Sequence, residues 1–154
     1  MSSERNWLSA VPWESVVSLN KALCQAQKLE PLHNAKGFPA AMRLWEASVP
    51  RKLAFRAVIE VCHEAFQFSP FTFNNGNTFA AIARTLLEEP LKDVPPVEAQ
   101  IIRTTVCHYI VDLIGAKELQ QVLRHFEGRL ASAPVSGKAE PSVTVPISAQ
   151  EQRA

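Results

Sequence analysis

The stretch that most constrains the fold runs from position 49 to 68 and reads VPRKLAFRAVIEVCHEAFQF. Two apolar stripes follow it at helical spacings of three and four residues. One consists of Leu53, Ala57, Val58, Val61 and Ala65, and the other of Phe55, Ile59, Cys62 and Phe66. A helix that is apolar over most of its circumference is a buried one, whereas a surface helix carries a single stripe. Because Pro50 also suits a first helical turn, the stretch predicts a buried central helix over about 50–68.

Proline and glycine punctuate the rest of the chain and predict the other helices. These are expected over about 13–30, 40–48, 79–89, 97–114 and 117–130, with Asn77 or Thr78 capping the fourth helix and Gly115 ending the fifth. No long alternating run of β-branched residues indicates a strand. The sequence therefore predicts an all-α, single-domain bundle of five to six helices over residues 6–130. Residues 131–154, rich in proline and small polar residues, are expected to form a disordered tail.

Composition and charge exclude several classes of protein. Sixteen Lys and Arg against fifteen Asp and Glu leave a net charge of +1, so no overall field favours nucleic acid or an anionic membrane. No apolar run approaches the roughly 18 residues of a membrane span, and no secretory signal precedes the first helix. Three cysteines without a framework spacing indicate reduced thiols. We therefore expect a soluble cytoplasmic protein that binds neither nucleic acid nor membranes.

The polar strips of the central and fifth helices are the strongest candidates for a pocket. Arg56, Glu60 and His63 share one strip, and His108 and Asp112 share the other. Carboxylates three or four residues from a histidine can hold its imidazole in place. An enzyme or ligand-binding protein with His63 and His108 on the wall of one pocket is thus an alternative. However, the chain has no GxSxG, GxxxxGK[ST] or GxGxxG motif and only five glycines. These absences favour a non-enzymatic protein without a cofactor.

A doubled Val-Cys-His raises the question of zinc. Cys62 and His63 lie in the central helix, and Cys107 and His108 lie in the fifth, so the four residues form a Cys2His2 set. Adjacent helical residues point about 100° apart, which makes it difficult for one helix to aim both ligands at one ion. Both cysteines also belong to apolar stripes and suit a core. A zinc-stabilised bundle is therefore an alternative, and the expected metal content is none.

Several basic and aromatic residues are candidates for a protein interface. The basic ones, near the entry of the central helix, are Arg43, Arg51 and Lys52; the aromatic ones, in terminal or irregular segments, are Trp7, Trp13, Phe71 and Phe73. Trp, Phe and Arg anchor protein–protein contacts, although burial in the fold is the ordinary alternative for the aromatics. We therefore predict a non-enzymatic interaction module: an adaptor, scaffold component or small regulatory subunit. Its partner would be another protein, or a second copy of the chain in a homo-oligomer.

Overall fold

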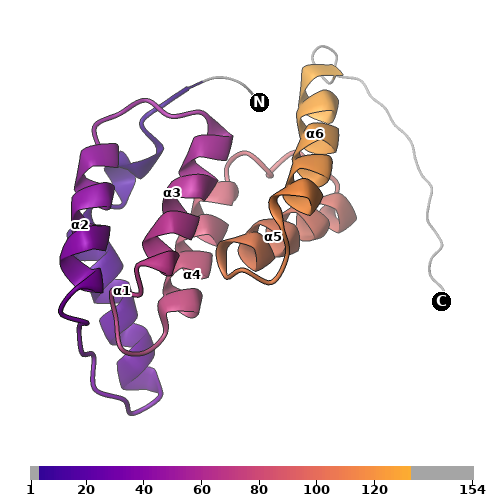
Figure 1. Cartoon of the computed structure of the whole chain (residues 1–154). Coiled ribbons are helices and arrows are strands. Elements are labelled where there is room, and N and C mark those ends of the chain that lie inside the picture. The colour runs from indigo at the N-terminus through magenta and orange to yellow at the C-terminus, as the bar shows by residue number, and fades with distance from the viewer. Residues whose placement is uncertain (1–3, 133–154) are drawn as a thin grey trace.

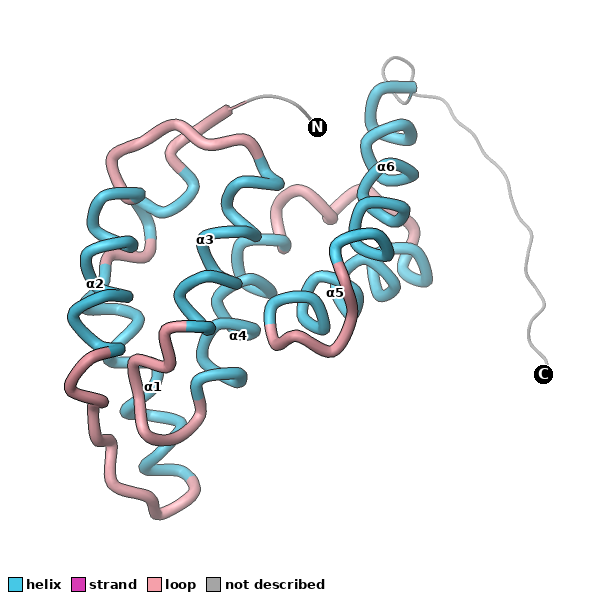
Figure 2. Tube along the Cα trace, in the orientation of Figure 1, coloured by secondary structure: helices cyan, strands magenta, loops and turns pink. Residues whose placement is uncertain are grey.

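The computed structural model describes the backbone of residues 4–132 and the side chains of residues 4–125. Its elements in chain order are the 3-10 helix η1 (Trp7–Ala10) and the helices α1 (Trp13–Ala26), α2 (Gly37–Ser48), α3 (Phe55–Gln67), α4 (Asn75–Leu87), α5 (Pro96–Ile110) and α6 (Ala116–Ser132). Figure 2 shows these helices joined by loops, with no strand in the described part. The predicted all-α bundle is confirmed. The expected tail lies outside the described residues from 133 onward.

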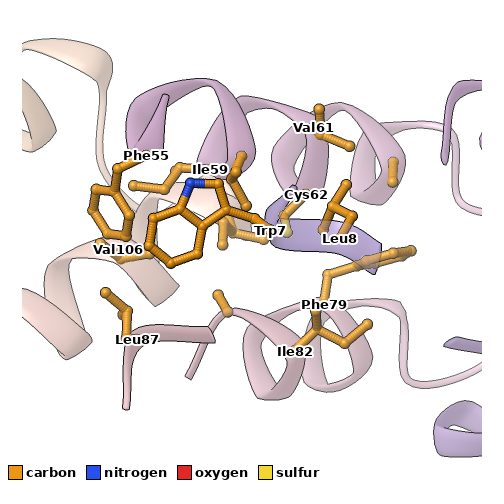
Figure 3. Close-up of a cluster of buried hydrophobic side chains, with 14 of the residues drawn as sticks. Trp7, Leu8, Phe55, Ile59, Val61, Cys62, Phe79, Ile82, Leu87 and Val106 are labelled. Carbon is orange, nitrogen blue, oxygen red and sulfur yellow. The ribbon is translucent and has the colours of Figure 1, made fainter. Parts of the chain in front are cut away.

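Helix α3 is the centre of the bundle, as its two apolar stripes predict. It packs against α2, α4, α5 and η1 (Figure 1). Figure 3 shows Ile59 and Cys62 of α3 in one apolar cluster with Phe79 and Ile82 of α4 and Leu8 of η1. Ile59 is only 3% exposed and Cys62 is fully buried. The prediction of a buried central helix is therefore confirmed.

The central helix begins at Phe55, not at Pro50 as the proline suggested. Leu53 is the reason, because its N–H donates to the carbonyl oxygen of Arg5 and its own carbonyl accepts from the N–H of Arg5. This antiparallel bridge holds Leu53 in extended backbone, and Ala54 follows in the extended region as the N-cap. A contact with the N-terminal segment thus delays the helix by about one turn.

Two other helices end earlier than predicted, because residues other than glycine adopt left-handed backbone. Helix α1 ends at Ala26 and is followed by Lys28 with φ of 60°. Helix α5 ends at Ile110 and not near Gly115, since Asp112 has φ of 64°. In both places the N–H of the residue after the left-handed one donates to a carbonyl oxygen in the last turn of the helix, which forms a Schellman motif. The expectation of a glycine stop for the fifth helix was therefore wrong.

The loops before α2 and before α4 pack against each other and lengthen both helices. Asn34 donates to the carbonyl oxygens of Ser69 and Phe71 at 2.8 and 3.0 Å. Helix α2 then begins at Gly37, three residues before the predicted start. Helix α4 begins at Asn75, after a left-handed Asn74, rather than at position 79. Polar residues that predicted a loop thus extend the helices by fixing their first turns.

Helix α6 packs mainly on α5 and projects from the rest of the bundle (Figure 1). Leu119 and Leu123 face α5 and are at most 3% exposed, as the amphipathic pattern predicts. The predicted inward side chains at positions 126 and 130 lie outside the described ones. Since α6 covers only part of α5, one flank of this helix pair faces solvent.

Candidate functional site

Four of the five predicted polar-strip residues meet where the end of α5 lies against α3. Arg56, Glu60 and His63 come from α3, at helical spacings that put them on one face, and Asp112 follows α5. Tyr109 of α5 completes this group, which we call the α3–α5 network. The sequence alone did not mark Tyr109, because its ring fits the apolar stripe of α5 and only the packing reveals where its hydroxyl points.

Glu60 accepts hydrogen bonds from both sides in the α3–α5 network. The hydroxyl of Tyr109 lies 2.8 and 2.9 Å from the two carboxylate oxygens of Glu60 and donates to them. Arg56 Nε donates to Glu60 Oε2 at 3.3 Å from one helical turn earlier. Burial of Tyr109, followed by its hydrogen bond to the Glu60 carboxylate, raises its pKa to about 12. The phenol is therefore protonated at neutral pH and is no base.

His63 has its ring between two carboxylates. Its Nε2 lies 2.7 Å from Asp112 Oδ1, and its Nδ1 lies 3.9 Å from Glu60 Oε1. The ring also packs on Tyr109, with 4.5 Å between the ring centroids. The hydrogen bond from His63 lowers the pKa of Asp112. Asp112 has left-handed backbone at a position that glycine usually occupies after a helix. Its carboxylate reaches His63 from there.

The α3–α5 network links two helices through hydrogen bonds between its own side chains. A general base needs a nitrogen or oxygen that can reach a substrate proton. Here one nitrogen of His63 is hydrogen-bonded to Asp112 and the other faces Glu60. Glu60 itself is held by Tyr109 and Arg56. Apart from His63 Nδ1, which is too far from Glu60 Oε1 for a hydrogen bond, these groups bind one another and link the end of α5 to α3.

The structure places His108 away from His63, although the sequence put both on the polar side of buried helices. His108 lines a hollow between α4 and α5 with Arg84, Arg103 and Cys107. His63 instead pairs with Asp112. The two histidines therefore do not meet in a single arrangement, and each has its own set of neighbours.

The two cysteines of the doubled motif lie in the core, where the apolar stripes predicted them. Cys62 is fully buried, and its burial, together with the neighbouring Cys107 thiol, raises its pKa to about 12. Cys107 is 8% exposed. No group of three or more His, Cys, Asp and Glu side chains within the described residues is arranged to hold a metal ion. The two cysteines are therefore neighbours, whereas the two histidines have different surroundings. Adjacent positions on a helix point about 100° apart, so a cysteine and the histidine after it face different directions.

The candidate interface residues divide between core and surface. Trp7, Trp13 and Phe71 are at most 7% exposed, so the folded chain does not present them to a partner. Trp7 packs on Phe55, and Trp13 stacks on Phe71 with 6.1 Å between ring centroids. Trp7 and Trp13 begin η1 and α1, and Phe71 lies in the loop before α4, so packing onto the helices buries all three. The remaining four candidates, Arg43, Arg51, Lys52 and Phe73, are exposed.

A groove between α5 and α6 is the feature that the sequence did not reveal. It has a volume of about 250 Å³, and its lining residues are Glu98, Ile101, Ile102, Gln121, Val122 and His125. Ile101 is 51% exposed, and Val97, one turn earlier on α5, is 74% exposed. We call the groove and these two side chains the α5–α6 groove. The pattern of α5 predicted burial around much of its circumference, so the open flank was missed.

Comparison with known proteins gives no relative on which to base a function. No family model, no curated protein and no solved structure matches the chain. None of the helices in the described residues has the length and apolar character needed to cross a bilayer.

Proposed function

We propose that the chain is a non-enzymatic protein-interaction module, such as an adaptor, a scaffold component or a small regulatory subunit. Its partner would place an amphipathic helix in the α5–α6 groove. The observation that supports this proposal most directly is the exposure of Val97 and Ile101, one turn apart, beside a groove with Ile102 and Val122 in its lining. Exposed apolar side chains gathered at a hollow are typical of protein contacts.

A helix is the occupant that fits the walls of this groove. Two packed helices leave a furrow between them, and a third helix can lay one apolar stripe along such a furrow. Ile101, Ile102 and Val122 would meet that stripe. Glu98, Gln121 and His125 also line the groove and provide polar groups beside it, which is the usual arrangement of an interface with an apolar centre and a polar rim.

The alternative of an enzyme has less support. The α3–α5 network holds the residues best suited to acid–base chemistry, and they bind one another. All three cysteines are free, and burial raises the pKa of Cys62 and Cys107, which makes these two thiols weak nucleophiles at neutral pH. Free thiols also suit a reducing compartment, and a cytoplasmic location is therefore part of the proposal.

Site-specific photo-crosslinking tests the proposed groove. A benzophenone amino acid is placed at Ile101 and, as a matched control, at Leu32, which has nearly the same exposure in a distant loop, 49% against 51%. We expect the probe at position 101 to capture a partner through a helical segment and the probe at position 32 not to. The captured protein is then purified, and its affinity is measured for the native chain, Ile101→Asp and Leu32→Asp.

Ile101→Asp should weaken that affinity by about tenfold or more, because a carboxylate would be buried against apolar groups. Leu32→Asp should leave it unchanged. Equal affinities for all three proteins would refute the groove as the binding site. A crosslink from position 101 to a second copy of the chain would instead assign the groove to a homo-oligomer.

A further inference from the structure

The hollow between α4 and α5 is lined by cations and neutral polar groups. Its volume is about 210 Å³, and its lining residues are Arg84, Gln100, Arg103, Thr104, Cys107 and His108. No carboxylate is among them. The hollow lies outside both the α3–α5 network and the α5–α6 groove, and the protein-interaction proposal makes no use of it.

The two arginines lack an anionic partner within the described part of the chain. Neither Arg84 nor Arg103 forms an ion pair with a carboxylate of residues 4–125. Arg103 Nη1 donates to Gln100 Oε1 at 2.9 Å, and Gln100 Nε2 donates to Thr104 Oγ1 at 3.2 Å. Thr104 thus uses its oxygen as an acceptor and keeps its hydrogen to donate. Most of the guanidinium hydrogens are likewise available.

Both arginines lie near the thiol of Cys107. Burial raises the pKa of Cys107, while the nearby Arg84 and, more weakly, Arg103 oppose that rise. Cys107, at 8% exposure, lines the hollow together with both arginines.

We propose that this hollow binds the phosphate group of a small molecule. Arginine forks bind phosphate oxygens through paired hydrogen bonds, and two of them balance a charge between −1 and −2. The donors lie on α4 and on successive turns of α5, so they reach a group that offers oxygens in several directions. A tetrahedral phosphate does so, whereas a carboxylate offers two oxygens in one plane. The volume equals the share of roughly seven liquid waters, which is enough for a phosphate.

The positive charges of the two arginines also disfavour a zinc ion beside His108. A divalent cation beside Cys107 and His108 would face Arg84 and Arg103 at close range, with no carboxylate in the lining to offset them. The hollow therefore selects anions over metal ions. His108, exposed at this site, can add a further donor from its imidazole.

Titration of the full chain with inorganic phosphate, with glycerol phosphate and with sodium chloride at equal ionic strength tests the site. Amide shifts are followed by NMR. We expect saturable shifts of residues 80–84 and 100–108 with a phosphate ligand and none with chloride. Tighter binding of glycerol phosphate than of inorganic phosphate would identify a phosphorylated metabolite as the source. Equal binding would identify the free ion.

Variants separate a built site from general charge attraction. Arg84→Gln and Arg103→Gln should each weaken phosphate binding by about tenfold or more, while Arg43→Gln, an exposed arginine on α2, should change it less than about twofold. Arg84→Lys keeps the charge but loses the paired donors of the guanidinium group, so its affinity for phosphate should lie between those of the native chain and Arg84→Gln. Circular dichroism checks that each variant is folded. Identical titrations of all variants, or shifts that chloride reproduces, would overturn the proposal.

Discussion

Tyr109 is the only tyrosine of the chain, so its ionisation can be followed by tyrosinate absorbance. The structure predicts a pKa of about 12, against an ordinary 10.0, because the ring is buried and the hydroxyl donates to Glu60. In Glu60→Gln the negative charge is gone but the burial, which is the larger cause, remains. We expect the pKa of Tyr109 to fall by roughly 1, so that its ionised fraction at pH 11 rises from roughly a tenth to about half.

The raised pKa of Tyr109 also determines how its contribution to the stability of the fold changes with pH. The unfolded chain loses this proton near pH 10 and the folded chain near pH 12, so the folded state binds more protons between these values. The contribution of Tyr109 to stability is therefore complete below pH 10 and is lost as the pH rises toward 12.

Glu64→Gln is the matched control, since Glu64 is an exposed carboxylate one turn further along α3. It should leave the titration of Tyr109 unchanged. Circular dichroism at each pH verifies that the titrating species is folded. A pKa near 10 in the folded native chain, or no difference between Glu60→Gln and Glu64→Gln, would contradict the hydrogen bond between Tyr109 and Glu60.

Two further predictions concern the backbone. Gly37→Ala would place a Cβ 2.0 Å from the carbonyl oxygen of Phe68, so the loops must separate, and we expect a loss of about 3 kcal/mol and a melting temperature lower by about 10 °C. Gly115→Ala meets no atom within 4 Å and should change the melting temperature little; equal effects would show that the close approach is absent. Lys28→Gly should stabilise by about 1 kcal/mol in urea unfolding, because Lys28 has φ of 60°, whereas Lys21→Gly within α1 should destabilise by about 1 kcal/mol. The same sign for both lysine variants would argue against the left-handed turn.

The α3–α5 network was only partly predictable, and the reason is the distance along the chain. Arg56, Glu60 and His63 lie on one face of α3 because helical spacing alone puts them there. Their link to Asp112, which is 49 residues from His63, requires α5 to end against α3. That end depends on an aspartate in a conformation usual for glycine, so the turn signals favoured Gly115 instead.

Two other features could not be predicted from the sequence for a related reason. One is the α5–α6 groove, and the other is the separation of His63 from His108. Hydrophobic periodicity states which faces of α5 are apolar, but it does not state which neighbour covers each face. Ile102 is 4% exposed and Ile101 is 51% exposed, although both are isoleucines in the same turn. The difference arises because Ile102 belongs to the core that α5 shares with its neighbouring helices, whereas Ile101 does not.

The sequence by itself determined the helical class, the central position of α3 and the burial of Cys62 and Ile59. These depend on local propensity and on a repeat of 3.6 residues, and each is complete within one segment. Tertiary structure decided where the helices begin and end, which charges meet, and which apolar side chains stay exposed. Leu53 is extended because Arg5 pairs with it, and Trp7 is buried because the N-terminal segment lies over α3. Such outcomes depend on contacts between residues far apart in the chain, whose free energies no single segment contains.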